Sequence, residues 1–286
     1  MDNSRIFSNF ASQFNKDKNI SMRKIYLIVL LILAVCISCQ WNLRPADGSE
    51  EMGDISIERF DRMEMLYLMT GDIAALQQMK TTYPAQTRTL IEDVLHLGMV
   101  DEPNINSRFL MFFQDSTLQA MMADVDREYG EIDDLNRQLT HSFRQLTRLL
   151  PDLPVPVVYT QVGSLDQSVI VGDGMLGISL DKYLGEDYPV YLRYGYTAEQ
   201  RRMMTRRYIV PDCLGFYLLR HYPLPESAED SVPLRHEHMS RIQYVVNTVM
   251  GKKIFTHGRV TEIETYMHAH PDVSVDELLS SDALPQ

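Results

Sequence analysis

Apolar residues recur every three or four positions over most of residues 63–150, which predicts several amphipathic helices in succession. The clearest repeat ends just before Pro151 and consists of Ile132, Leu135, Leu139, Phe143, Leu146 and Leu150. His141 lies off this stripe, so we interpret it as a solvent-exposed surface residue. This part of the folded chain is therefore expected to be helical.

The pattern changes between residues 155 and 180 to short β-branched runs, PVVYTQV, QSVIVG and MLGISL, which predict three short strands. Gly172, Asp173 and Gly174 separate the second run from the third, a composition typical of a tight hairpin turn with positive φ. The stretch ISIERFD at residues 55–61 predicts a further short strand that leads into a helix. The predicted fold class is α+β, predominantly α-helical, with a small central β-sheet of about three or four short strands.

Helical patterns resume after the strands. Thr197 and Gln200 have the spacing of a capping box, and another helix is predicted to begin near Pro211, a residue tolerated in the first turn. The segment PDCLGFYLLRHYP is apolar on nearly all sides, so we expect it to run through the core. Cys213 within it is interpreted as a core residue and not as a nucleophile.

A last clear helix is predicted from residue 236 to residue 250. The side chains expected to be buried along one side of it are Met239, Ile242, Val245, Val246 and Val249. Glu237 and Arg241 lie one turn apart and are predicted to form a salt bridge on the other side.

The N-terminal region has the pattern of a bacterial export signal. In MRKIYLIVLLILAVCISC, two basic residues precede an apolar run and a cysteine, Cys39. A cysteine after Ile-Ser resembles the lipobox of bacterial lipoproteins, in which the cysteine is lipidated and becomes the new N-terminus. The alternative, a transmembrane anchor, is less favoured because the apolar run of 13 residues is shorter than the ~20 that a spanning helix needs.

These features divide the chain into three parts. Residues 1–38 are assigned as an N-terminal extension and lipoprotein signal peptide. Residues 39–54 mix Pro, Gly and acidic residues without periodicity and are assigned as a flexible tether. Residues 55–286 are assigned as a single domain.

Charge and cysteine content exclude several classes of function. The first 38 residues hold five of the 27 basic and two of the 39 acidic residues, so the rest carries 22 against 37, a net charge of −15. Such an acidic body has no electrostatic footprint for nucleic acid or for anionic lipid headgroups at a membrane surface. If Cys39 is acylated, Cys213 is the remaining thiol, and no intramolecular disulfide can form.

The stretch PLRHEHMSRIQ looks like the start of a zinc-protease helix. That signature needs two histidines four residues apart, and here Ser240 stands at the second position. His236 and His238 are only two apart, so on a helix their side chains point about 200° away from each other. We predict no metal and no cofactor, with His236 and His238 as the alternative metal ligands.

Two carboxylates are candidates for a buried polar site. Asp181 follows a predicted strand, and Asp212 begins an apolar helix. As partners in a buried site, their pKa values would rise through desolvation. In the alternative interpretation, Asp181 is an N-cap and Asp212 is a first-turn residue favoured by the helix dipole.

The tyrosine-rich run YPVYLRYGY is a candidate partner surface, because Tyr and Arg are enriched where proteins meet. Its candidate residues are Tyr188, Tyr191, Arg193, Tyr194 and Tyr196. Tyrosines packed within a loop are the alternative.

The order of these segments carries a family resemblance. The lipobox cysteine is followed by ISIERFD, a helical region, VVYTQV, LGISLDKYLGEDYPVY, RRYIVPDCLGFYLLRHYP and a helix that ends in MGKKIF. From about residue 55 to about residue 255, this chain resembles the gliding-motility lipoprotein B (GldB) family of Bacteroidetes, most strongly in LDKYLGEDYPVY and RRYIVPD. The resemblance implies a part of the envelope machinery that moves or exports surface adhesins, membrane-anchored and facing the periplasm. It also implies a distant similarity to HExxH zinc peptidases without their metal ligands, and hence a zincin-like architecture.

The function predicted from the sequence is that of a non-catalytic cell-envelope lipoprotein in a motility or protein-export machinery. Its expected partners are the membrane, through the N-terminal lipid, and other envelope proteins, with no nucleic acid. The periplasmic face is the expected location. Two alternatives are a divergent metallohydrolase with a composite metal site, and a lipoprotein that binds a small molecule or glycan in a cleft beside the sheet.

Overall fold

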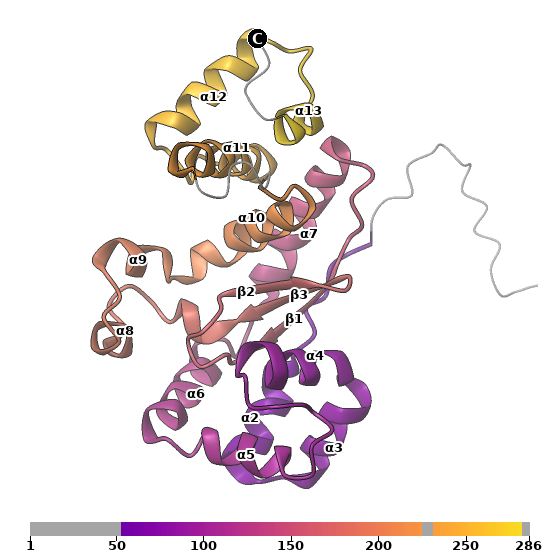
Figure 1. Cartoon of the computed structure of the whole chain (residues 1–286), viewed down its shortest axis with the longest axis vertical. Helices are drawn as coiled ribbons and strands as arrows, with labels where there is room; N and C mark the ends of the chain where they lie inside the picture. Colours follow the sequence, from indigo (N-terminus) through magenta and orange to yellow (C-terminus); the bar gives the residue numbers. More distant parts are fainter. Residues whose placement is uncertain (1–52, 225–230, 282–286) are drawn as a thin grey trace, which may run out of the picture. The chain divides into compact units, whose positions relative to one another are not determined.

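The computed structural model describes residues 53–224 and 231–281 (Figure 1). The contacts group Met52–Gln286 into one compact unit. Its buried apolar side chains, from Ile55 to Leu279, form one hydrophobic core, as expected of a domain that folds by itself. The lipid attachment at Cys39, the signal peptide and most of the predicted tether lie outside the described residues.

Helices make up the first part of the domain. They are α2 (Phe60–Thr70), α3 (Ile73–Thr82), α4 (Pro84–Arg88), the π-helical turn η1 (Thr89–Val94), α5 (Ile105–Phe112), α6 (Ser116–Glu128) and α7 (Asp133–Leu149). The carboxylates of Asp72 and Asp115 accept backbone N–H bonds at the starts of α3 and α6 and so cap them. The six apolar residues of the stripe along α7 are all buried and His141 is exposed, which confirms that prediction.

The sheet has three strands in the order β1-β3-β2. They are β1 (Val157–Gln161), β2 (Val169–Gly172) and β3 (Met175–Ser179). β1 pairs with β3 in parallel and β2 pairs with β3 antiparallel, so the predicted α+β class with a small sheet is confirmed. At the β2–β3 hairpin, Asp173 has φ 49° and Gly174 has φ 73°, the positive values that a tight turn needs.

The strand predicted at residues 55–61 is reduced to one parallel bridge between Glu58 and Tyr159. It ends there because α2 already begins at Phe60. Nearby, the backbone N–H groups of Ile55 and Ile57 donate to side chains of α7 and not to a neighbouring strand. This part of the chain is therefore held by the bridge at Glu58 and by side-chain hydrogen bonds.

Helical elements follow the sheet. They are the 3₁₀ turn η2 (Leu180–Tyr183), α8 (Pro189–Arg193), α9 (Ala198–Met203), the 3₁₀ turn η3 (Arg206–Tyr208), α10 (Ile209–His221), α11 (Val232–Met250), α12 (Gly258–Ala269) and α13 (Val275–Ser280). The capping box of Thr197 and Gln200 is present at α9, as predicted. α10 packs against β2, β3, α7 and α11, and Cys213 is fully buried within it, which confirms its core position. Among the described helices, none is long and apolar enough to cross a membrane.

The burial of two residues of helix α11 differs from the prediction. Met239, expected in the core, is 37% exposed, and Arg241, expected on the outer side, is 2% exposed. The Nε atom of Arg241 lies 3.3 Å from Oε1 of Glu237, and its guanidinium also donates to the Ser281 carbonyl. Arg241 is buried because α13 covers this side of α11 (Figure 1), a packing that the periodicity of α11 does not encode.

Candidate functional site

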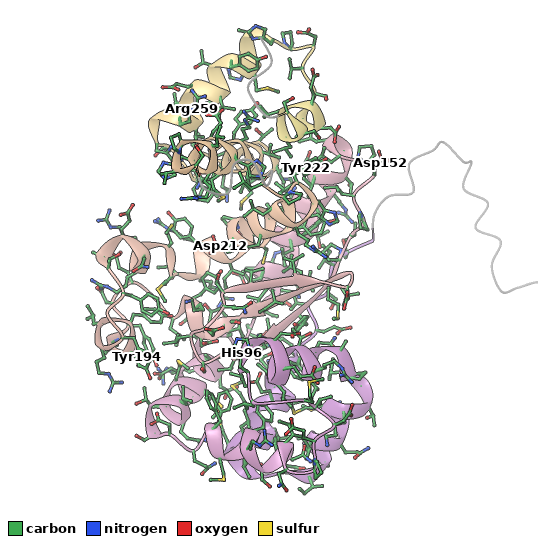
Figure 2. All side chains as sticks on the ribbon, viewed as in Figure 1. His96, Asp152, Tyr194, Asp212, Tyr222 and Arg259 are labelled. Carbon is green, nitrogen blue, oxygen red and sulfur yellow. The ribbon has the colours of Figure 1, made fainter. Side chains whose placement is uncertain are left out.

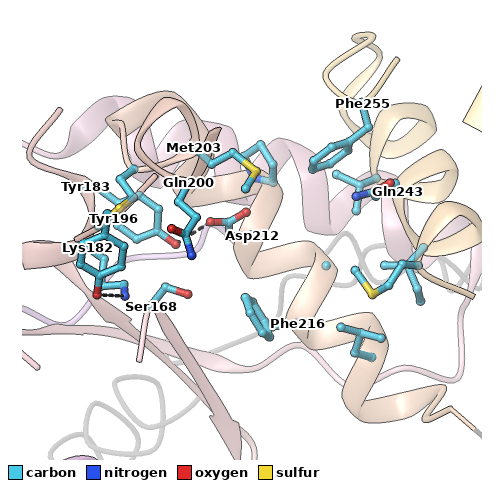
Figure 3. Close-up of a pocket in the computed structure, with 17 residues that line it drawn as sticks. Ser168, Lys182, Tyr183, Tyr196, Gln200, Met203, Asp212, Phe216, Gln243 and Phe255 are labelled. Atoms are coloured by element: carbon cyan, nitrogen blue, oxygen red, sulfur yellow. Dashed lines mark hydrogen bonds between the residues drawn. The ribbon is translucent and has the colours of Figure 1, made fainter. Parts of the chain in front are cut away.

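A cavity of about 480 Å³ is lined by residues of η2, α9, α10 and α11, with Ser168, Tyr196, Met204 and Phe255 (Figure 3). This volume is in the range of small-molecule sites. The polar side chains Lys182, Tyr196 and Ser168 lie together at one side of the view, Phe216 lies near the middle, and Phe255 lies toward the other side beside Gln243. The cavity thus has a polar end and a mainly apolar end.

The stretch around Tyr183 and the stretch that leads into α10 at Asp212 are distant in sequence and meet at the polar end of the cavity. The hydroxyl of Tyr183 donates a hydrogen bond of 2.8 Å to Oδ2 of Asp212, and the Ser168 side chain also bonds Tyr183. A backbone bridge between Leu184 and Thr205 holds the stretches together. Burial raises the pKa of Asp212 to about 7, although the Tyr183 hydrogen bond acts to lower it. This carboxyl group therefore keeps its proton to a higher pH than an exposed carboxyl group does.

Lys182 supplies the positive charge at the polar end. Its Nζ donates to the Leu165 carbonyl at 3.1 Å and to the Tyr196 hydroxyl at 3.0 Å, and lies 4.8 Å from the centre of the Tyr196 ring. An ammonium group has three N–H donors, so one remains for a further partner. Within residues 53–224 and 231–281, no carboxylate forms an ion pair with Nζ.

Asp181 is fully buried and has different partners from Asp212. Its two carboxylate oxygens accept the backbone N–H groups of Gly163 at 2.8 Å and Leu165 at 2.6 Å. Leu165 and the preceding Ser164 have positive φ of 66° and 51°, so Asp181 holds a turn that is costly for residues other than glycine. Burial raises the pKa of Asp181, and the two amides lower it in part. No described hydrogen bond joins Asp181 to Asp212, so a shared polar site remains a prediction.

Two other buried carboxylates were not among the residues that the sequence suggested for a buried polar site. Asp61 and Glu64 on α2 are both fully buried. Oε2 of Glu64 accepts the Val162 N–H at 2.9 Å, and burial raises the pKa of Glu64 well above its ordinary value. Asp61 pairs with Arg59 at 2.7 Å. Their three-residue spacing, on the helix face that carries Leu68, was the available signal.

The candidate tyrosine surface divides into packed and exposed residues. Tyr191 is fully buried and donates to the Asp181 carbonyl at 2.6 Å. Tyr188 donates to Oδ2 of Asp124 at 2.9 Å, and the rings of both Tyr188 and Tyr196 pack on that of Tyr191. Arg193 is exposed, and Tyr194 is 59% exposed (Figure 2). A contact surface here would consist chiefly of the end of α8.

The two histidines of the zinc-protease-like stretch face different surroundings. His236 is exposed, whereas His238 is buried with its Nε2 at 2.8 Å from the Tyr222 carbonyl oxygen. Burial lowers the pKa of His238. In the part of the chain that the structure describes, no three His, Cys, Asp or Glu side chains are grouped to hold a metal ion.

A family model described as gliding motility protein GldB matches residues 42–249. This range contains every residue that lines the cavity except Phe255. No curated protein and no solved structure matches the chain. The zincin-like architecture implied by the sequence resemblance is therefore not shown by these comparisons.

Proposed function

Because the chain belongs to the gliding motility protein GldB family, whose members are cell-envelope lipoproteins, we propose that it is a non-catalytic assembly component of a motility or protein-export machinery. The observation that carries the proposal is the family match over residues 42–249. In this proposal Cys39 carries the lipid, and the folded domain faces the periplasm. The protein then meets its partners from a fixed position at the membrane.

The contacts of the buried titratable groups support a structural role for them. Asp181 uses both carboxylate oxygens on backbone amides, and His238 is bonded to the Tyr222 carbonyl. Such hydrogen bonds hold a fold together and fix the positions of these two side chains. They favour an interaction protein over the metallohydrolase alternative.

The end of α8 supports a contact with another envelope protein. Leu192 is 55% exposed and Tyr194 is 59% exposed, with the exposed Arg193 between them. Aromatic and Arg side chains beside an exposed apolar residue are typical of the centre of a protein interface. We propose that these three residues form the partner surface.

Site-specific photocrosslinking in intact cells tests this function. A photoreactive amino acid replaces Tyr194, and Met111, which is 73% exposed on α5, serves as the matched control position. We expect the probe at position 194 to capture an envelope protein and the probe at 111 to capture none. If position 194 captures no envelope protein while the variant is folded and membrane-bound, the partner surface is elsewhere and the proposal loses its support.

A further inference from the structure

The apolar part of the cavity contains side chains that the fold leaves uncovered. Met203 is 42% exposed, Phe216 is 42% exposed and Met239 is 37% exposed, and all three line the same cavity. Exposed apolar residues gathered in one concave place are typical of a binding site. Methionine is unbranched and adaptable, so these walls suit a flexible apolar ligand.

Gly215 leaves open space in the wall of the cavity. It lies in the middle of α10, where glycine is among the least favourable residues, and it lines the cavity. A Cβ atom built on Gly215 would meet no atom within 4 Å. Packing within the described chain therefore does not require glycine here. A molecule that passes close to the α10 backbone would require it.

The polar end of the cavity favours a negative head group. Lys182 has an unused N–H donor and no carboxylate partner among the described residues. Gln200 adds an amide that can donate hydrogen bonds, whereas the single hydroxyl proton of Ser168 is already donated to Tyr183. Asp212 is compatible with an anion when its carboxyl group is protonated.

We propose that this cavity binds an amphiphilic monoanion of the fatty-acid class. The carboxylate of the ligand binds Lys182, and its alkyl chain runs along the glycine face of α10 toward Phe216. The cavity volume of about 480 Å³ accommodates a ligand of this size. The inference concerns a site separate from the α8 surface and does not depend on the proposed partner contact.

Photolabelling of the full chain in phosphatidylcholine nanodiscs tests the site. The probe is a fatty acid with a diazirine in its chain, and labelled peptides are identified by mass spectrometry. We expect labels on α10 and α11. Gly215→Leu should reduce labelling about tenfold, because its side chain occupies the space beside the helix. Gly258→Leu is the matched control: Gly258 is the first residue of α12, has no atom within 4 Å of a built Cβ and lies outside the cavity.

The head group is tested with Lys182→Met, which removes the charge and keeps an apolar stem. Labelling by the fatty acid should fall about tenfold, whereas labelling by a photoreactive fatty alcohol of the same length should not change. Gly215→Ala provides a second cavity variant, expected to melt no lower than the wild type and yet to be labelled less.

Two results would overturn the inference. Labelling that is unaffected by both Gly215 variants would show that the probe binds elsewhere. Equal labelling by a photoreactive phosphatidylcholine would show that a bilayer lipid, and not a monoanion, enters the cavity. Neither result bears on crosslinking from position 194, so the two proposals fail separately.

Discussion

The hydroxyl of Tyr183 donates a hydrogen bond of 2.8 Å to Oδ2 of Asp212, and this bond joins η2 to the first turn of α10. Both residues line the cavity beside Lys182. Burial raises the pKa of the Tyr183 hydroxyl well above its ordinary value, so Tyr183 remains a hydrogen-bond donor across the neutral pH range. The titrating member of the pair is therefore Asp212.

We expect Asp212→Asn to make the protein less sensitive to pH. The pKa of Asp212 rises from 3.8 to about 7 on folding, so the folded state binds this proton more tightly than the unfolded state. The stability that the protonated carboxyl group contributes is fully present below pH 3.8 and is lost as the pH rises through about 7. Asn cannot ionise and can still accept from Tyr183. In thermal melts, the Tm of Asp212→Asn should exceed that of the wild type by more at pH 8 than at pH 5.

Asp173→Asn is the control for that series, because Asp173 is exposed in the hairpin turn. Its melting curves should follow those of the wild type at each pH. A constant difference between Asp212→Asn and the wild type from pH 5 to pH 8 would contradict the assigned titration.

Asp181→Ala is expected to destabilise the domain strongly. The substitution leaves the backbone N–H groups of Gly163 and Leu165 buried without an acceptor. Each unsatisfied donor costs about 1–3 kcal/mol, so the free energy of unfolding in urea should fall by about 2–6 kcal/mol. Asp166→Ala removes an exposed carboxylate from the same loop and should change little. Equal losses in the two variants would show that Asp181 does not hold the turn.

Local signals in the sequence were sufficient for several elements. The α7 stripe, the capping box of α9 and the β2–β3 hairpin each depend on residues within a few positions of one another. Arg241 was misplaced because its burial depends on α13, which lies more than 30 residues further along the chain. From sequence alone, two opposite charges one helical turn apart are interpreted as a solvent-exposed pair, because the local pattern does not show that a distant helix covers them.

Only part of the cavity could be predicted from the sequence. Asp212 stood out because it lies in a segment that is apolar on nearly all sides, where its carboxylate was expected to be desolvated. Lys182 and Gly215 gave no local signal, since their importance arises when η2, α9, α10 and α11 enclose a common space. Tyr191 was chosen as a surface residue from composition, and the packing of α8 buries it. Composition does not tell which side of a short helix faces inward.

Gly177→Ala is expected to disrupt the sheet. Gly177 pairs with Tyr159 across β1 and β3, and a Cβ on Gly177 would lie 2.5 Å from the Tyr159 ring. The ring is buried against Phe60, with 6.2 Å between ring centroids, so it cannot move without opening the core. Overpacking of this kind costs about 1–3 kcal/mol in the free energy of unfolding.

The matched control for that substitution is Gly172→Ala, at the end of β2, where a Cβ meets nothing within 4 Å. Its unfolding midpoint in urea should stay near that of the wild type. Replacing Tyr159 with Leu in the Gly177→Ala background should recover part of the loss, because the shorter side chain clears the added methyl. Without such recovery, the ring is not the cause of the destabilisation.

The metallohydrolase hypothesis is tested by the elemental metal content of protein purified without chelator. We expect no stoichiometric zinc in the wild type or in the His236→Ala, His238→Ala double variant, because the two rings face different surroundings and His238 is bonded to the Tyr222 carbonyl. His238→Ala alone should lower the free energy of unfolding by about 1 kcal/mol through loss of that hydrogen bond, and His236→Ala should have little effect. Near-stoichiometric zinc that disappears in the double variant would instead make His236 and His238 ligands, and the enzyme hypothesis would then replace the assembly role.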